Sequence, residues 1–390
     1  MIKLPAYPSE LSSNSHHLFL SSGSKKLIIF FAAQNMKPGK YNFFQMGKEI
    51  DENLLFVNDL SNQWYQNGID SLGETFEETI NVIQQWIKHL NIDEVYTLGT
   101  SMGGYAAIMY GVHLNANILS FAPEIILKTP YSRSKKKIRA KTKIHYPNLE
   151  EIIKGYTKPI TVICGESDVL DIYFAGLLTP TKTLQVITIK GADHYIPTFL
   201  TRASYTTNIV RTFYQSGKPD MNNIFEVGDI LKDQNLGKKL YAAYIALQKK
   251  EYHSVELITN DILDNNAYIE LAHYLKGSAL IKVKNYSAAK ESLATASLLA
   301  PTVAEYLFYY SHAVRMLGDK TQSLYLLNML LKKFPNFDKA HYAKGMILFE
   351  QNKFEMALRS LEKAYYLNIS NESYKKMKIK CSEKIDAKNI

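Results

Sequence analysis

The sequence predicts an α/β fold, with a mostly parallel sheet flanked by helices, followed by an all-α solenoid. Between residues 26 and 215, short apolar runs alternate with amphipathic helical segments. After about residue 220 these runs stop, and residue types recur with a period of 34. A chain of 390 residues is long for one hydrophobic core. We therefore expect two domains, 1–218 and 219–390.

Strands are expected where the apolar runs leave no polar face. Such runs are typical of a parallel sheet that is covered by helices on both sides. They are 26–31, 53–58, 94–99, 117–122, 159–165 and 184–191. A helix is expected at 73–90, because Phe76, Ile80 and Ile83 recur at helical spacing, as does Ile87. A second is expected at 196–214. This alternation predicts a layered α/β sandwich.

The second domain contains an internal repeat. Small or apolar residues recur in step 34 positions apart, in the sets Gly277, Ser311 and Gly345; Ala289, Ser323 and Ala357; Ala296, Leu330 and Ala364; and Pro301 and Pro335. The pattern resembles the tetratricopeptide repeat, with three copies from about 270 and a degenerate copy from about 236. A generic helical bundle is the alternative. The polar tail, 371–390, is expected to cap the solenoid.

Composition limits the compartments and partners. The formal net charge is +9, and eight Lys or Arg residues with no acid lie between Lys128 and Lys143. No apolar run reaches the roughly 18 residues that a membrane span needs, and no basic-then-apolar leader begins the chain. Cys164 and Cys381 lack metal-ligand or redox spacing, so no metal site is expected. We expect a cytoplasmic protein that needs no bound cofactor.

The motif Gly99-Thr100-Ser101-Met102-Gly103 points to chemistry. G-x-S-x-G alone is a weak signal, but here it follows a strand run and precedes a helix rich in small residues. A nucleophilic serine on a sharp strand-to-helix turn requires this context. Glycines on both sides remove Cβ atoms that would collide with backbone. The alternative is that Ser101 only caps a helix.

A serine nucleophile needs a base and a carboxylate that orients the base. His194 follows the last strand run and is the only histidine between the acids after residue 165 and the helical half. The alternative is an ordinary surface histidine. For the acid we favour Asp168, just past the run 159–165, over Asp171, Glu166 and Asp193, because later positions would enter a helix.

Together these residues resemble those of a serine α/β-hydrolase, over residues 20–215. The resemblance places Ser101, Asp168 and His194 in a catalytic triad. It also implies an oxyanion hole of two backbone N–H groups. One donor would be Met102. The other would come from the loop after the first central strand, at Ala33 or Gln34, although the His-Gly-Gly-Gly form of many lipases is lacking.

The basic segment, about 124–147, lies where this family inserts a cap over the site. We expect Arg133, Lys135, Lys136, Lys137 and Arg139 to bind an anionic substrate. A solvated charged loop is the alternative. The segment lacks the interleaved aromatics of a nucleic-acid stacking platform, so nucleic acid is not an expected partner.

Trp64 and Tyr65 lie in a polar loop after a strand, where they could stack on sugar rings or form a packing cluster. Short motifs between 30 and 124 also resemble bacterial hydrolase-fold proteins that modify surface glycans, some of which are sugar O-acetyltransferases.

These observations predict a serine esterase or deacylase that acts on an acylated carbohydrate or another anionic ester. One alternative is an O-acetyltransferase that moves acetyl from acetyl-CoA, as co-substrate, to a bacterial polysaccharide. The other is a catalytically silent scaffold whose repeats bind a protein partner or associate with a second copy.

Overall fold

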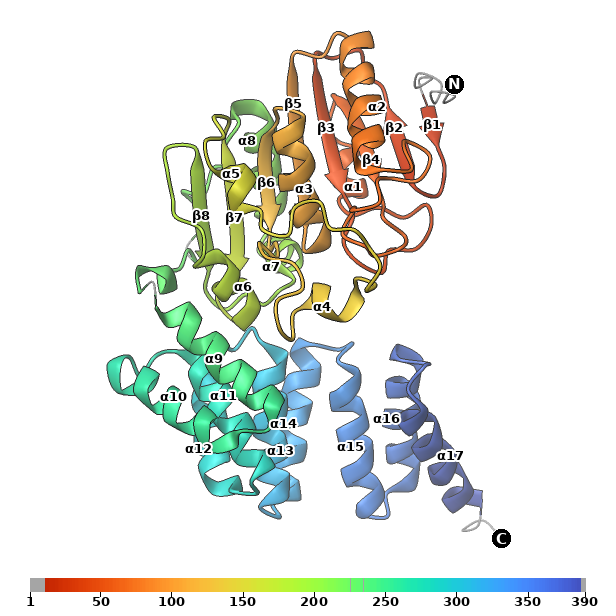
Figure 1. Cartoon of the computed structure of the whole chain (residues 1–390). Coiled ribbons are helices and arrows are strands. Elements are labelled where there is room, and N and C mark those ends of the chain that lie inside the picture. Colours follow the sequence, from red (N-terminus) through yellow and green to blue (C-terminus); the bar gives the residue numbers. More distant parts are fainter. Residues whose placement is uncertain (1–10, 225, 234, 387–390) are drawn as a thin grey trace. The chain divides into compact units, whose positions relative to one another are not determined.

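The computed structural model describes residues 11–224, 226–233 and 235–386. The chain divides into two compact units, Met1–Tyr241 and Ala242–Ile390. The first contains the sheet, and the second is helical (Figure 1). Each is described separately.

A single eight-stranded sheet forms the centre of the first unit. Its order is β1-β2-β4-β3-β5-β6-β7-β8. β1 and β2 pair antiparallel, and β2 pairs antiparallel with β4, whereas β3 to β8 run parallel. The strands are β1 (Leu11–Ser13), β2 (His17–Leu20), β3 (Lys26–Phe31), β4 (Asn53–Val57), β5 (Glu94–Thr100), β6 (Asn117–Phe121), β7 (Ile160–Gly165) and β8 (Leu184–Ile189). The six expected runs are therefore strands, and the edge hairpin of β1 and β2 adds two more.

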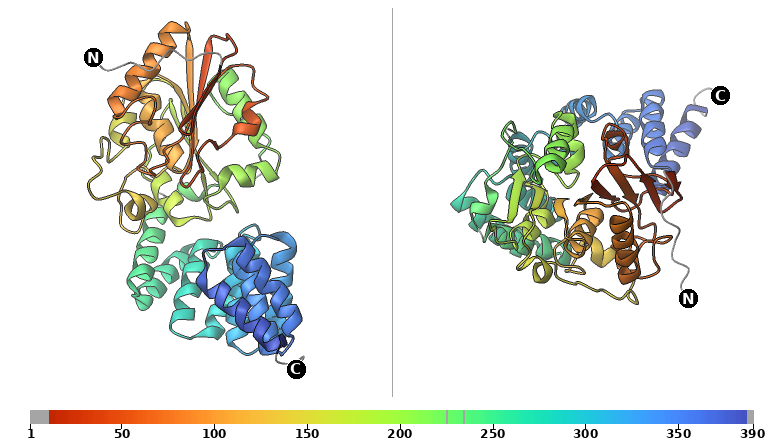
Figure 2. Two further views of the ribbon diagram at one scale, coloured as in Figure 1. Left: turned by 90° about the vertical axis from the view of Figure 1, so that its right-hand side faces the viewer. Right: turned by 90° about the horizontal axis from the view of Figure 1, so that it is seen from above.

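Helices cover both faces of this sheet (Figure 2). Ile209, Val210 and Phe213 of α8 pack into one core cluster with Phe30 and Phe56 of the sheet. α2 and α3 cover the opposite face, where Phe31 contacts Tyr110. The helices are α1 (Phe44–Gly47), α2 (Phe76–His89), α3 (Met102–His113), α4 (Arg133–Lys137), α5 (Glu150–Ile153), α6 (Val169–Ala175), α7 (Ile196–Arg202) and α8 (Thr206–Ser216). The expected helix 196–214 is thus two helices, because Ser204 adopts a positive φ of 64° between them.

The first unit extends beyond the expected boundary at 218. Ile224 lies in its core cluster, and Val227 bridges to Ile189 at the end of β8. The buried Glu166 carboxylate accepts hydrogen bonds from the Ile230 amide, at 3.0 Å, and from the Thr188 hydroxyl, at 2.7 Å. These contacts place Ile224, Val227 and Ile230 in the first unit, beyond the expected boundary at 218.

The second unit is a series of antiparallel helix pairs (Figure 1). Its helices are α9 (Leu236–Lys249, which crosses the division), α10 (Tyr252–Asn265), α11 (Glu270–Lys282), α12 (Tyr286–Leu299), α13 (Ala304–Met316), α14 (Lys320–Lys333), α15 (Asp338–Glu350), α16 (Phe354–Leu367) and α17 (Glu372–Asp386); a short 3₁₀ turn, Ile230–Lys232, precedes α9. Each pair from α11 to α16 spans one period of 34 residues. The terminal α17 buries Tyr374 and Cys381, as a capping helix should.

Small residues allow the paired helices to approach closely. A Cβ on Gly277 would lie 2.5 Å from Cγ of Leu293, and one on Gly345 would lie 2.7 Å from Cγ of Leu361. The equivalent Ser311 is 2% exposed, and its carbonyl accepts a 2.9 Å hydrogen bond from Ser323 of the paired helix. The period of 34 therefore records contacts between the two helices of each pair.

None of the helices in the described part of the chain is both long and apolar enough to cross a bilayer.

Gly277→Ala should destabilise the helical unit by about 1–3 kcal/mol, because the added methyl overpacks against Leu293. The gain in helix propensity, about 1 kcal/mol, offsets only part of this cost. Urea unfolding followed by circular dichroism would measure the change. Ser311→Ala, at the equivalent position, is the control and should cost about 1 kcal/mol or less. Unchanged unfolding of the glycine variant would contradict the close approach.

Candidate active site

Ser101 lies on a sharp turn between β5 and α3. Its backbone has φ 57° and ψ −116°, a conformation that non-glycine residues rarely adopt. Such strain costs about 1–3 kcal/mol and persists only where the surroundings enforce it. Here the Ser101 amide donates to the Phe121 carbonyl at 2.8 Å, and the Ser101 carbonyl accepts from the Tyr105 amide at 3.0 Å. The turn is therefore fixed on both sides of the serine.

Two glycines make this turn possible. A Cβ on Gly99 would lie 2.2 Å from the Gly103 carbonyl oxygen, and a Cβ on Gly103 would lie 2.1 Å from that of Phe31. No side chain fits at such distances. The structure therefore confirms the steric reason for the two glycines. The contact of Gly103 with Phe31 brings the start of α3 against the end of β3.

The Ser101 hydroxyl does not cap α3. Its side chain makes no capping hydrogen bond, and its Oγ lies 2.8 Å from Nε2 of His194. A serine whose role was to cap would turn its oxygen toward the free N–H groups of the helix. The hydroxyl instead points toward an imidazole that comes from a loop 93 residues further along the chain.

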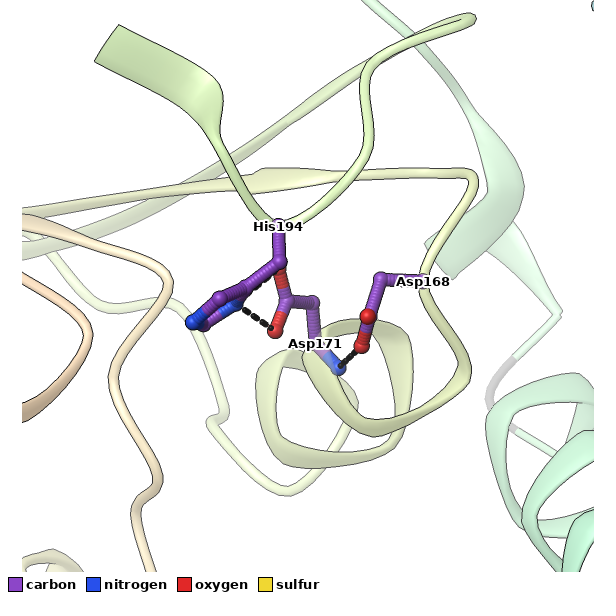
Figure 3. Close-up of side chains that lie close together, drawn as sticks. All are labelled: Asp168, Asp171 and His194. Carbon is purple, nitrogen blue, oxygen red and sulfur yellow. Dashed lines mark hydrogen bonds and ion pairs between the residues drawn. The ribbon is translucent and has the colours of Figure 1, made fainter. Parts of the chain in front are cut away.

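His194 joins Ser101 to a carboxylate, and that carboxylate belongs to Asp171. Nδ1 of His194 lies 2.8 Å and 3.1 Å from the two carboxylate oxygens of Asp171. Figure 3 shows the imidazole turned toward this carboxylate. The carboxylate is 1% exposed and the imidazole 12%. With Nδ1–H donating to a carboxylate, Nε2 is left to accept the proton of the serine hydroxyl.

The expected acid, Asp168, has a different role. One of its oxygens caps α6 by accepting from the amides of Leu170 and Asp171, each at 3.0 Å. The other accepts from Arg133 at 2.6 Å. Asp171 was disfavoured because it would enter the helix, which it does, in the first turn. Helical side chains lean toward the N-terminus, so Asp171 can reach back to the histidine loop.

The other two acids also lie outside the Ser101–His194 contact. Glu166 accepts from the Ile230 amide, in the segment after α8, and from the Thr188 hydroxyl of β8. Asp193 accepts a 2.9 Å hydrogen bond from the Tyr195 amide, which shapes the loop that carries His194.

Burial and neighbouring charges shift the pKa values of Asp168 and Asp171 in opposite directions. Burial, and next the charge of Asp168, raise the pKa of Asp171 to about 6, although His194 and Arg133 act in the opposite direction. Burial would also raise the pKa of Asp168, but Arg133 and His194 outweigh it and the net shift is downward. Burial lowers the pKa of Arg133, but Asp168 and Asp171 more than reverse this, so its guanidinium stays charged.

The structure distinguishes between the two candidates for the second oxyanion donor. The Ala33 amide donates to the side-chain oxygen of Asn42 at 2.7 Å, so it is already occupied. Among the described residues, the amides of Gln34 and Met102 have no such protein acceptor. Met102 is the first residue of α3, whose leading N–H groups point out of the helix. Asn42 carried no recognisable sequence signal.

Trp64 and Tyr65 are not a sugar-stacking surface. Both are fully buried, and the Tyr65 hydroxyl donates to the Ala32 carbonyl at 2.9 Å. Their loop is polar because its side chains satisfy backbone groups. The Asp59 carboxylate, for example, accepts from the amides of Gln63 and Tyr65 at 2.7 and 2.9 Å. The packing-cluster alternative is therefore the correct one.

The basic segment 124–147 is tied down and its side chains face different ways. Gln63 accepts from the Arg139 amide at 2.9 Å, and Gln66 accepts from the His145 amide at 2.8 Å. The side chains of Lys135, Lys136, Lys137 and Arg139 are exposed. Arg133 is the exception, because its guanidinium turns inward to Asp168 and Asp171. The expectation that Arg133 binds substrate directly is thus not met by its position.

Asp168, Asp171 and His194 offer ligand atoms within 4.8 Å of one another, an arrangement that could hold a cation. Both carboxylates, however, already contact the Arg133 guanidinium, and Nδ1 of His194 contacts Asp171. The oxygens that a cation would use are therefore already in contact with protein donors.

A pocket of about 940 Å³ lies between the loop after β3 and helix α7, and its lining does not include Ser101, Asp171 or His194. One wall includes Tyr41, Asn42 and Phe43, from the loop whose Asn42 binds the Ala33 amide. The other includes Pro197 and Thr198 of α7, which begins two residues after His194. Its volume is in the range of small-molecule sites.

Comparison with known proteins identifies the repeats. A family model described as tetratricopeptide repeat matches residues 271–303 and 338–369, which are the pairs α11–α12 and α15–α16. The unmatched pair α13–α14 lies between them in the same period. The helical half of the chain therefore contains tetratricopeptide repeats. No match is found among curated proteins.

Solved structures with similar repeats are remote. The MamA protein is 14% identical, with 38% of this chain and 90% of that chain covered and a TM-score of 0.33. The first TPR of Spaghetti (RPAP3), bound to an HSP90 peptide, is 19% identical, with 30% and 93% covered and a TM-score of 0.29. The Sgt2 TPR domain from Aspergillus fumigatus is 20% identical, with 31% and 81% covered and a TM-score of 0.30.

Gly103→Ala should destabilise the first unit by about 1–3 kcal/mol or more, because the Phe31 carbonyl is backbone and cannot rotate away. Urea unfolding followed by circular dichroism measures this cost. The control is Gly176→Ala, where the nearest atom to the new Cβ is 3.2 Å away; it should change stability by about 1 kcal/mol or less. Equal unfolding midpoints for the two variants would argue against the tight turn.

Proposed function

We propose that the first unit is a serine hydrolase that cleaves a carboxylic ester through an acyl-enzyme. The observation that carries this proposal is the unbroken line of contacts from Ser101 through His194 to Asp171, with the serine on a strained turn. Its support includes the G-x-S-x-G motif between a strand and a helix, and the chain order serine, acid, histidine. Serine α/β-hydrolases share both features.

The proposed reaction begins when Ser101 Oγ attacks the ester carbonyl and its proton passes to Nε2 of His194. The imidazolium is stabilised by the Asp171 carboxylate, and it returns the proton to the leaving alcohol. The amides of Met102 and Gln34 are the proposed donors to the oxyanion. Water, activated by His194 in the same way, then releases the acid. A sugar hydroxyl in place of water would make the protein an acyltransferase, with acetyl-CoA as a possible donor.

An acylated carbohydrate or another anionic ester is the proposed substrate class. Aromatic side chains and the Asn42 amide line the pocket between the loop after β3 and α7, a combination that suits a polyhydroxylated ring. The exposed cations Lys135, Lys136, Lys137 and Arg139 would attract a negatively charged substrate by long-range electrostatics.

The tetratricopeptide repeats favour a second function, binding of a protein partner or of another copy of the chain. Stacked helix pairs present extended surfaces that suit either task. We propose that the repeats recruit the catalytic unit to a partner. If the first unit had no catalytic activity, this binding would be the whole function.

Ser101→Ala should abolish hydrolysis of p-nitrophenyl acetate, with a loss of about 10³-fold or more in kcat, because the nucleophile is removed. The initial rate of p-nitrophenolate release measures it. Ser120→Ala, a buried serine on β6 whose hydroxyl binds the Gly104 carbonyl, is the matched control and should remain active. Equal rates for wild type and the Ser101 variant would favour the silent scaffold.

Asp171→Asn and Asp168→Asn should have very different effects on the same assay. Loss of the Asp171 charge should lower kcat by about 10³–10⁴-fold, because the imidazolium loses its stabilising partner. Asn at 168 still caps α6, so we expect a loss of about tenfold or less, equivalent to about 1.4 kcal/mol. The reverse order of effects would restore Asp168 as the acid.

A further inference from the structure

We propose that Arg133 is a positioning residue that holds Asp171 ionised and correctly oriented for His194. This proposal rests on the proposed function, since it assigns a role within the same site. It separates Arg133 from the exposed cations of the basic segment, with which it shares only a stretch of sequence.

The geometry shows one guanidinium shared between two carboxylates. NH2 of Arg133 lies 2.6 Å from Oδ2 of Asp168, and NH1 lies 3.4 Å from Oδ1 of Asp171. That same Oδ1 lies 2.8 Å from Nδ1 of His194. A planar fork with donors on separate nitrogens can contact both carboxylates at once, which a lysine ammonium cannot do with the same rigidity. Arg133 and His194 thus contact the same oxygen of Asp171, and the guanidinium also ties that carboxylate to Asp168.

The backbone of Arg133 is also fixed by hydrogen bonds. Its backbone amide donates to Oε1 of the buried Glu124 at 2.7 Å, and Glu124 also accepts from the Ser134 amide. The Ser132 hydroxyl caps the same short helix through the Lys135 amide. With its side chain 23% exposed, Arg133 is fixed more firmly than a solvated surface arginine.

The charges around Asp171 require a cation. The groups that face it are Asp168 on the same helix, His194 after β8, Arg133 with Glu124 behind it, and the Cys164 thiol of β7. Burial, and next the charge of Asp171, raise the pKa of Cys164 well above its usual value, so the thiol is neutral. Without Arg133, the buried Asp171 carboxylate and the partly exposed Asp168 carboxylate would face each other beside one imidazole. One of them would then retain a proton, as paired carboxylates do.

The direction of the pH effect follows from these charges. Asp171 must be ionised to stabilise the imidazolium. A plot of activity against pH should therefore fall on its acidic side, and this fall is called the acidic limb. Removing the Arg133 cation raises the pKa of Asp171, because the carboxylate then binds a proton more readily. Removing the Asp168 anion lowers the pKa of Asp171.

The experiment compares profiles of kcat/KM against pH for p-nitrophenyl acetate in the full chain. We expect Arg133→Met to move the acidic limb up by about one pH unit or more, and Asp168→Asn to move it down. The double variant should return close to wild type, because one charge of each sign is removed. Arg211→Met, on the exposed face of α8, is the matched control and should leave the limb in place.

Arg133→Lys keeps the charge but loses the fork. Its limb should lie between those of wild type and Arg133→Met, and its kcat should be lower than that of wild type. It also provides the test if Arg133→Met does not fold. If the Arg133 variants are active and their acidic limb lies where that of the wild type does, the positioning role of Arg133 is overturned and the proposed function is not. A wild-type protein without serine-dependent activity would instead overturn the proposed function.

Discussion

The close approach of α3 to the end of β3 is the constraint on which the candidate site depends. The Phe31 carbonyl and the Gly103 backbone can meet only because residue 103 has no side chain. This contact forces the chain to reverse direction at Ser101 and places its hydroxyl at the carboxyl edge of the sheet. β7 and β8 run parallel to β5 and end at the same edge, so the loops that follow them bring Asp171 and His194 to the hydroxyl.

A second constraint is the balance of buried charge. Two aspartates three positions apart lie at the start of α6, and the fully buried Asp171 would cost several kcal/mol to bury unpaired. Arg133 contacts both carboxylates, so that Asp168 fixes the helix start while Asp171 faces the imidazole. The basic segment therefore contributes one inward cation to the site, whereas Lys135, Lys136, Lys137 and Arg139 are exposed.

Sequence reasoning found the elements with strong local signals. Apolar runs predicted the six parallel strands, and the period of 34 predicted the repeats that the family model matches. The motif around residue 101 and the position after the last strand predicted a contact between Ser101 and His194, and the structure shows that contact; their catalytic role stays a prediction. The carboxylate that contacts His194 is that of Asp171 and not of Asp168, the expected acid. The expectation placed the helix start correctly, but Asp168 is used to cap α6, and Asp171 in the first turn leans back toward the histidine loop.

Other errors came from long-range contacts. The polar loop left two interpretations of Trp64 open, sugar stacking and a packing cluster, and only the structure shows that the polar side chains bind backbone groups and the ring is buried. Arg133 looked like its lysine neighbours, and only the folded chain shows its partners 35 and 38 residues away. Asn42 and the edge hairpin of β1 and β2 carry no pattern that distinguishes them from ordinary loop residues.

The most direct measurement is labelling of the full chain with a fluorophosphonate, followed by peptide mass spectrometry. Fluorophosphonates react with serines activated by a neighbouring base, whatever the natural substrate. The account predicts one adduct, on Ser101, and its loss when His194 is replaced by alanine. An unlabelled protein, or a Ser101 adduct that forms equally well without the imidazole, would contradict it.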